Sequence, residues 1–153
     1  MRIEKVNVED LEDIENIVEM SKCAFLTDIN VGGNMGDCPP DYDSLAWHKQ
    51  MADEGHLYKA IFDNKMVGAA VLFIDENSKS LYVGRIFIDS NFHKKGYGIK
   101  LMESIETYFP HIQQIDLDTP SWNVRTNSFY QKIGYTILKE EDGFVFYHKD
   151  LYR

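Results

Sequence analysis

Three apolar-rich segments follow one another in the middle of the chain, and short polar runs separate them. The segments cover residues 57–62, 66–75 and 80–89, each within the usual length of a β-strand. The intervening residues 63–65 (Asp-Asn-Lys) and 76–79 have the composition of tight turns between antiparallel strands. The pattern therefore predicts three consecutive strands joined by hairpins.

Near the start of the chain, apolar residues recur at steps of three and four from residue 11 onward, which is the spacing of one helical face. Asn7 is positioned to cap this helix, with Asp10 three residues later in the capping-box position. We expect the helix to end near Ala24, because residues 27–40 contain glycines and a pair of prolines and read as a loop.

The remaining segments complete the predicted element order. Helices are expected over residues 42–53, from residue 97 or 98 to 109, and over residues 124–132. Further strands are expected over residues 2–6, 114–118, 135–139 and 144–149. This order predicts an α+β (mixed α/β) fold: a mixed, mostly antiparallel sheet of about seven strands with helices on both faces. No linker or internal repeat divides residues 1–153, so a single domain is expected.

Charge and cysteine content exclude several classes of function. The 153 residues carry a formal net charge of −9, which opposes binding to nucleic acid. The longest apolar run, residues 66–74, is shorter than the roughly 20 residues that cross a bilayer, and the first residues lack the apolar centre of a signal peptide. Cys23 and Cys38 are too few for a disulfide framework and lack metal-ligand spacing. We therefore expect a cytoplasmic protein that binds no nucleic acid, membrane or metal.

A basic, glycine-containing loop follows the strand at residues 80–89 and stands out against the acidic background. Gly96 and Gly98 let the backbone approach an anion closely, and the helix that begins here leaves N–H groups without partners. Lys94 and Lys95 add positive charge. The loop therefore suits a phosphate group, with a plain strand-to-helix turn bearing solvated lysines as the alternative. A P-loop does not fit, because Gly98 is followed by Ile99-Lys100 and not by Lys-Ser/Thr. A dinucleotide fold does not fit, because its glycines follow the first strand of a parallel unit and these follow a run of hairpins.

Two motifs together resemble the GNAT (GCN5-related N-acetyltransferase) superfamily. Residues 93–98 read His-Lys-Lys-Gly-Tyr-Gly and are similar to that family's phosphate motif Gln/Arg-x-x-Gly-x-Gly/Ala, with His93 at the Gln or Arg position. Residues 123–135 read Asn-x-x-Thr-x-x-Phe-Tyr-x-Lys-x-Gly-Tyr and are similar to a later family motif, with Thr126 in place of Ala. The element order extends the resemblance to nearly the whole chain.

The resemblance implies a site for acetyl-CoA as cosubstrate, without a metal. In this family the strand before the phosphate loop splays from its neighbour and the pantetheine arm lies in the gap, which implies backbone contacts from Ile86, Phe87 and Ile88. Asn123 is expected to lie beside the cofactor arm, and Tyr130 is also expected to contact the cofactor. The residues implied to hold the diphosphate are His93, Lys94, Lys95, Gly96, Tyr97, Gly98 and Ile99.

Transfer of an acetyl group to an amine needs a proton acceptor, stabilisation of the oxyanion and a proton for the leaving sulfur. Tyr130 matches the family's tyrosine acid, and a phenol with a pKa of about 10 remains protonated at neutral pH. A half-buried core tyrosine is the alternative interpretation. The oxyanion donor is expected to be a backbone N–H near Phe87 or Ile88, by resemblance.

The general base is expected to be Asp118, at the end of its strand, with Asp116 on the same face by strand parity. A water chain is the alternative to a single base. Arg85 lies between apolar residues in mid-strand, where a charge needs a partner. We expect Arg85 either to pair with one of these aspartates or to hold a substrate carboxylate.

The acceptor side is expected to involve the loop after the first helix, whose carboxylates and aromatic rings suit a cationic amine. These residues are Asp28, Asp37, Asp41, Asp43, Tyr42 and Trp47, and a solvated acidic loop is the alternative. The resulting hypothesis is direct transfer from acetyl-CoA to a small amine, a peptide N-terminus or a lysine. A homodimer is left open. The competing hypotheses are a non-catalytic acyl-CoA-binding module and an interaction domain that binds no nucleotide.

Overall fold

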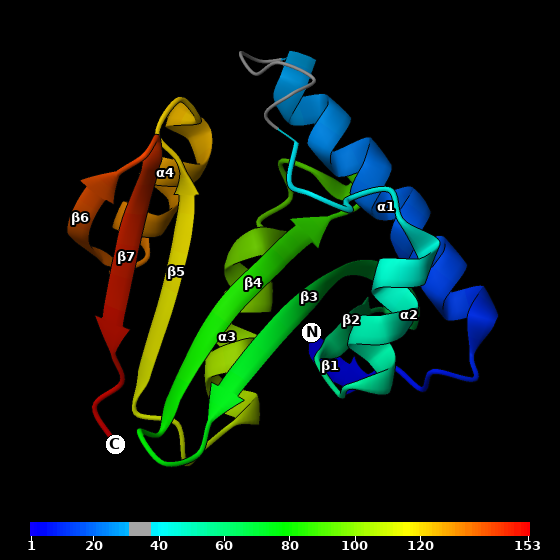
Figure 1. The fold of residues 1–153 in the computed structure, drawn as a ribbon, viewed down its shortest axis with the longest axis horizontal. Helices are drawn as coiled ribbons and strands as arrows, with labels where there is room; N and C mark the ends of the chain where they lie inside the picture. Colours follow the sequence, from blue (N-terminus) through cyan, green and yellow to red (C-terminus); the bar gives the residue numbers. More distant parts are fainter. Residues whose placement is uncertain (31–37) are drawn as a thin grey trace.

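The computed structural model describes residues 1–30 and 38–153, and its centre is one seven-stranded sheet in the order β1-β2-β3-β4-β5-β7-β6 (Figure 1). Neighbouring strands are antiparallel except β4 and β5, which are parallel. The α+β prediction with a mixed, mostly antiparallel sheet is therefore confirmed. The strands are β1 (Arg2–Lys5), β2 (Leu57–Phe62), β3 (Lys65–Asp75), β4 (Ser80–Ile88), β5 (Gln114–Pro120), β6 (Thr136–Glu141) and β7 (Phe144–Asp150).

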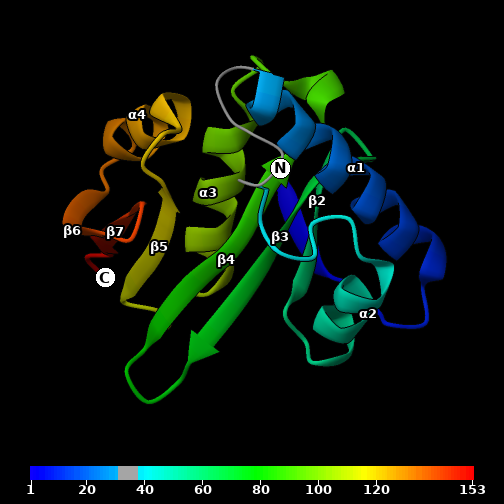
Figure 2. The ribbon, with the colours of Figure 1, turned by 45° about the horizontal axis from the view of Figure 1, so that its top comes forward.

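Helices cover both faces of the sheet, as expected. One face carries α1 (Leu11–Asn30) and α2 (Leu45–Asp53), and the other carries α3 (Tyr97–Tyr108) and α4 (Val124–Lys132) (Figures 1 and 2). Successive residues of a strand point to opposite faces, so the sheet has two apolar cores: a larger one under α3 and α4, and a smaller one under α1 and α2. No helix in the described ranges is long and apolar enough to cross a membrane.

The first helix differs from its prediction at both ends. Asp10 is its cap, because the Oδ1 atom of Asp10 accepts a hydrogen bond from the amide of Asp13 at 3.1 Å. Asn7 instead accepts from the amide of Glu9 at 2.9 Å, in the turn before the helix. The helix passes the expected end at Ala24 and runs to Asn30. The Thr27 hydroxyl donates to the Cys23 carbonyl at 2.9 Å, a contact that a helical turn permits.

The second helix begins at Leu45, three residues later than predicted. The Ser44 hydroxyl caps it by accepting from the Trp47 amide at 3.1 Å. Tyr42 lies in the preceding turn, and Asp41 there has a φ of +61°. The prediction missed this cap because it read the residues before Ser44 as helical. Strand β5 is two residues longer than predicted, since Thr119 and Pro120 still pair with β7.

Strands β4 and β5 pair along only part of their lengths, and this separation forms the site. The parallel ladder joins residues 80–83 of β4 to residues 114–117 of β5. Gly84 is an extra residue at a bulge, because Val83 and Arg85 lie opposite consecutive residues of β3. Beyond this point β4 follows β3 while β5 follows β7, and Figure 1 shows the two strands diverging.

Candidate functional site

A cavity of about 710 Å³ lies where β4 and β5 diverge. Four of the expected site residues line it: Ile86, Asp118, Asn123 and Tyr130. The segment at residues 38–40 and the β6–β7 turn at residues 142–144 also line it. The other expected residues, Phe87, Ile88 and the loop at 93–99, lie outside this wall.

The backbone of β4 offers donors on the side from which β5 has diverged. The amide of Asp89 donates to the Val67 carbonyl of β3 at 2.8 Å. Along an antiparallel ladder, alternate residues direct their N–H groups to opposite sides, so the Phe87 amide also faces β3. The amides of Ile86 and Ile88 consequently face the gap. The Phe87 side chain packs in the smaller core and those of Ile86 and Ile88 pack against the larger one, so the groups of this segment that face the gap include the amides of Ile86 and Ile88 but not that of Phe87.

The glycine loop leads into α3 with an uncapped helix start. Gly96 is the N-cap residue with a φ of +76°, and no side chain caps the helix. The first amide bonded within the helix belongs to Lys100, which donates to the Gly96 carbonyl at 3.3 Å. The amides of Tyr97, Gly98 and Ile99 precede this bond and point toward the helix mouth. A Cβ atom at Gly98 would lie 3.4 Å from the Phe129 ring of α4, an ordinary van der Waals contact, so the packing of the two helices does not itself require glycine here.

The charged side chains of the loop divide into two groups. The His93 Nε2 atom lies 2.7 Å from the Ile88 carbonyl oxygen, so this ring fastens the loop to the end of β4. Lys94 and Lys95 are exposed, and the Lys95 ammonium lies 5.8 Å from the centre of the Phe92 ring. Positive charge therefore surrounds the helix mouth, where the helix dipole also favours an anion.

Asn123 is buried at the start of α4, with 5% of its surface exposed. Its side-chain oxygen accepts from the amide of Thr126 at 3.1 Å, so Asn123 is the helix cap. The Thr126 hydroxyl in turn bonds the Thr119 hydroxyl of β5 at 2.7 Å. The threonine that replaces the family's alanine therefore ties α4 to the diverging strand.

Tyr130 reaches the cavity from α4 and is 6% exposed. Its ring packs against Phe129, Tyr135 and Tyr147, with centroids 5.2, 5.9 and 5.8 Å away. Burial, together with the nearby negative charge of Asp118, raises the pKa of Tyr130 above its ordinary value. The phenol is therefore a proton donor across the neutral range. No hydrogen bond of its hydroxyl occurs within the described residues.

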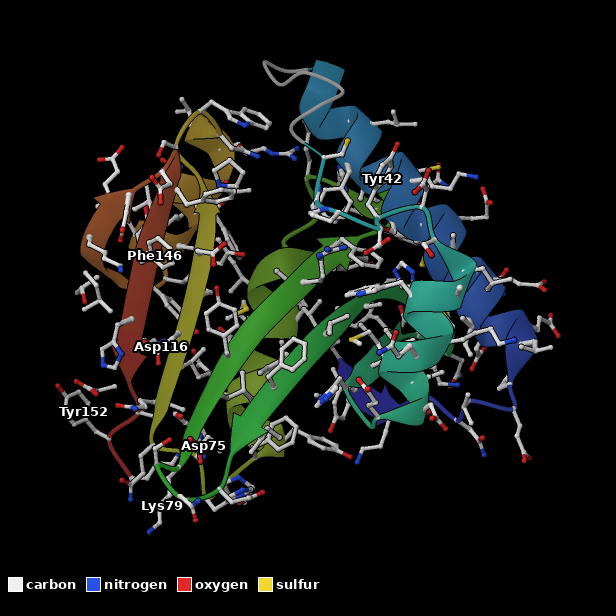
Figure 3. The ribbon with its side chains drawn as sticks, viewed as in Figure 1. Tyr42, Asp75, Lys79, Asp116, Phe146 and Tyr152 are labelled. Carbon is white, nitrogen blue, oxygen red and sulfur yellow. The ribbon has the colours of Figure 1, made fainter. Side chains whose placement is uncertain are left out.

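The two aspartates of β5 have different partners. Asp116 accepts from the Nδ1 atom of His148 at 2.8 Å, whereas Asp118 accepts a hydrogen bond from the Tyr82 hydroxyl of β4. Figure 3 shows Asp116 and Phe146 on a face of β5 and β7 that no helix covers. Asp118 shares this face with Asp116 by strand parity, so its carboxylate lies at the open side of the cavity.

Arg85 pairs with neither aspartate, and that prediction was wrong. Its Nη2 atom donates to the Pro40 carbonyl, and the guanidinium carbon lies 4.4 Å from the centre of the Trp47 ring. The end of the β4–β5 ladder at Val83 and Leu117 accounts for the error, because Arg85 lies beyond it and its guanidinium is held by Pro40 and Trp47 instead. The alternative that Arg85 holds a substrate carboxylate is not affected by these contacts.

The acidic loop contributes less to the cavity than expected. Asp41 and Asp43 are exposed, and neither lines the cavity. The Tyr42 ring packs edge-on against Phe25. Asp37, like Gly32, Gly33 and Gly36, lies outside the described residues, as does the side chain of Asp28.

Several residues that line or support the cavity were missed by the sequence interpretation. Tyr82 is the clearest case: its alternation with Leu81 and Val83 indicated its face of the sheet, but its partner depends on the β4–β5 register. Other lining residues were missed because they come from elements far apart in the sequence, and no local sequence pattern indicates that such residues meet. They are Phe25, Pro39, Pro40, Trp122 and Phe144.

Comparisons with known proteins agree with this geometry. A model of the Acetyltransferase (GNAT) family matches residues 16–135. The structure of PaiA N-acetyltransferase from Thermoplasma acidophilum in complex with coenzyme A is 17% identical, has a TM-score of 0.81, and 98% of each chain is covered. A GNAT family acetyltransferase from Streptococcus agalactiae is 16% identical with a TM-score of 0.79, over 99% of this chain and 96% of that one.

A relative by sequence is the Bacillus subtilis (strain 168) protein YrkN, which is 25% identical over 112 residues. The match covers 72% of this chain, and the chain spans 60% of the length of YrkN. The structural likenesses establish the shared fold, and the family model covers more than half of the chain. The chain therefore belongs to the GNAT family of acetyltransferases.

Proposed function

We propose that this chain is an N-acetyltransferase that moves the acetyl group of acetyl-CoA directly onto an amine within a ternary complex. The observation that carries the proposal is the cavity at the β4–β5 divergence. Tyr130, Asp118 and Ile86 all line this cavity, and burial raises the pKa of the Tyr130 phenol. Such an arrangement supplies the proton donor, proton acceptor and oxyanion donors that acyl transfer needs.

The residues fit the cosubstrate in two places. The amides of Tyr97, Gly98 and Ile99 at the uncapped start of α3, with Lys94 and Lys95 nearby, suit the diphosphate. The amides and carbonyls of Ile86 and Ile88 suit the amide groups of the pantetheine arm. The Ile88 carbonyl already accepts a bond from His93, so its second lone pair remains for the arm.

Bound acetyl-CoA supplies an activated thioester, and the side chains move the protons. Asp118 accepts a proton from the acceptor's ammonium, directly or through water. The amine nitrogen then bonds to the acetyl carbon as the carbon–sulfur bond breaks. The amide of Ile86 or Ile88 stabilises the negative carbonyl oxygen, and Tyr130 donates its proton to the departing sulfur. The second proton of the attacking nitrogen passes through water to the Tyr130 phenolate, which leaves a neutral amide and restores the phenol. No covalent enzyme intermediate is needed when both substrates are held side by side.

Two measurements test the proposal in sequence. Excess acetyl-CoA should raise the melting temperature, because a ligand at a concentration of 100 times its Kd stabilises the native state by about 2.7 kcal/mol. Amines are then supplied with acetyl-CoA, and released coenzyme A is measured as free thiol. An unchanged melting temperature contradicts cofactor binding. A clear thermal shift with no thiol release from any amine favours the non-catalytic module.

A further inference from the structure

The guanidinium of Arg85 is only partly satisfied by the described residues. Its Nη2 atom donates to the Pro40 carbonyl, and its flat face stacks on the Trp47 ring. The Nη1 atom is buried and has no hydrogen-bond partner among the described residues. A buried donor of a charged side chain that makes no hydrogen bond raises the free energy of the folded state. The described residues do not provide a partner for this atom.

No carboxylate of the described residues compensates this charge by direct contact. The closest negative influence is Asp41, which is exposed and makes no hydrogen bond to Arg85 among those described. Both groups that hold Arg85, a carbonyl and an aromatic face, are uncharged. They fix the plane of the guanidinium without neutralising it.

The charges on the described cavity wall are arranged with opposite signs. Arg85 is the sole cation among the described lining residues, and Asp118 and Asp142 are the anions. Arg85 and Asp118 lie on the two strands that diverge, each just past the last paired residues, Val83 and Leu117. The cavity therefore presents a positive group on its β4 side and a negative group on its β5 side.

We propose that the acceptor is a small amine that also carries a carboxylate, as a free amino acid does, and that the guanidinium of Arg85 binds this carboxylate. The inference rests on the proposed acetyltransferase function. The ammonium lies toward Asp118, where it loses its proton, and the carboxylate is held on the opposite strand. A planar guanidinium is well matched to a carboxylate, and a hydrogen bond between them is charge-assisted.

The size of the cavity supports a small acceptor. The space of about 710 Å³ must accommodate the end of the pantetheine arm and the acceptor together. A long polyamine has no anion for Arg85 and would place a second cation in the same space. An amine with a carboxylate satisfies both ends of the charge pattern.

The experiment compares pairs of acceptors that differ only in the carboxylate. The standard amino acids and their primary amides are assayed with acetyl-CoA by thiol release, on the wild type and on Arg85→Met and Arg85→Lys. Arg2→Met is the control, because Arg2 pairs with Glu4 on the exposed surface of β1. The acetyl-CoA thermal shift of each variant verifies that the site is folded.

For at least one pair, the wild type should prefer the acid over the amide by roughly 10- to 100-fold in kcat/KM, the range expected for a hydrogen bond between charged groups. Arg85→Met should abolish this preference, chiefly through the KM of the acid. Arg85→Lys should retain part of it, and Arg2→Met all of it. A preference for amides, or an equal loss for acid and amide in Arg85→Met, would overturn the inference.

A binding measurement separates this inference from the proposed function. The chain has two tryptophans, Trp47 and Trp122. One stacks on Arg85 and the other lines the cavity, so their fluorescence reports on a ligand there. With coenzyme A present, N-acetyl amino acids should change the emission of the wild type but not that of Arg85→Met. The N-acetyl amides should change the emission of neither protein.

If these binding results are obtained but no amine is acetylated, the proposed enzyme activity is rejected and the carboxylate site is supported. Equal responses to acids and amides would reject the site.

Discussion

The hydroxyl of Tyr82 on β4 donates a hydrogen bond to the carboxylate of Asp118 on β5, directly across the point where the two strands diverge. Tyr82 belongs to the last paired stretch of β4, whereas Asp118 is the first residue of β5 beyond the ladder. Burial and the hydrogen bond to Asp118 raise the pKa of Tyr82, so the phenol remains a donor at neutral pH. The bond fixes the carboxylate at the open side of the cavity.

Asp118→Asn should reduce kcat by about 100-fold or more, because general-base catalysis typically contributes 10²- to 10⁴-fold. Tyr82→Phe leaves the carboxylate in place but frees its orientation, so a smaller loss is expected. Acetyl-CoA binding, measured by calorimetry, should be the same in both variants. Unchanged turnover in Asp118→Asn would show that Asp118 is not the general base and would favour a water chain in its place.

Tyr130→Phe should lower kcat by at least about 10-fold, since protonation of the leaving sulfur is a general-acid step, while the acetyl-CoA thermal shift is retained. Burial raises the pKa of Tyr130, so the wild-type rate should show no decline from ionisation of this group as the pH rises to its ordinary pKa of about 10. Stopped thiol-release assays across that range provide the measurement. A Tyr130→Phe variant with full activity would indicate that Tyr130 is a core residue.

Gly96→Ala should weaken acetyl-CoA binding, because the φ of +76° at the α3 cap is strained for any other residue and shifts the amides that follow. The matched control is Gly55→Ala, which has a φ of +81° at the end of α2, far along the chain from the loop. Each variant should lose about 1–2 kcal/mol of unfolding free energy in urea titrations. Only Gly96→Ala should also raise the Kd for acetyl-CoA. An equal Kd in both variants would count against a diphosphate site at this helix.

His148 should make stability depend on pH. Its two ring nitrogens lie 2.8 Å from Asp116 and 2.9 Å from Asp150, and the hydrogen bond to Asp116 is the main reason that the pKa of His148 is raised. The stabilisation is therefore fully present below the unfolded pKa of about 6.5 and is lost as the pH rises through the higher folded value.

Urea unfolding between pH 6 and pH 9 tests this expectation. The wild type should lose no more than about 1 kcal/mol relative to His148→Gln over that interval, because the group is partly exposed. His111→Gln is the control, since its contact with Glu76 is exposed. Parallel pH profiles for the wild type and His148→Gln would contradict the assignment.

The parts of the fold that the sequence predicted are those specified by neighbouring residues. The bounds of β2 and α4 agree with prediction, because Leu57–Phe62 and Val124–Lys132 are delimited by turn residues and by the Asn123 cap. The start of α3 at Tyr97 agrees with one of the two predicted positions, which followed from the end of the glycine loop. In each case a local pattern was sufficient.

The parts that escaped prediction depend on residues distant in the chain. The bond between Tyr82 and Asp118 requires the parallel β4–β5 pairing and its register, which sequence spacing does not specify. Of the two alternatives for Arg85, the pairing with an aspartate was wrong because the end of the β4–β5 ladder and the position of Pro40 and Trp47 beside Arg85 are set only in the folded chain. The sequence therefore indicated which residue types the site contains, but their contacts with one another depend on how the strands pair.

The most direct test of the central claim is an amide NMR titration of the wild type with acetyl-CoA. The account predicts that the largest chemical-shift changes occur at two separate places: the helix mouth at residues 96–99, and Ile86 and Ile88 on the diverging strand. These are the backbone donors assigned to the diphosphate and to the pantetheine arm. Saturating acetyl-CoA that leaves both sets of amide signals unmoved, or that shifts only residues elsewhere, would contradict it.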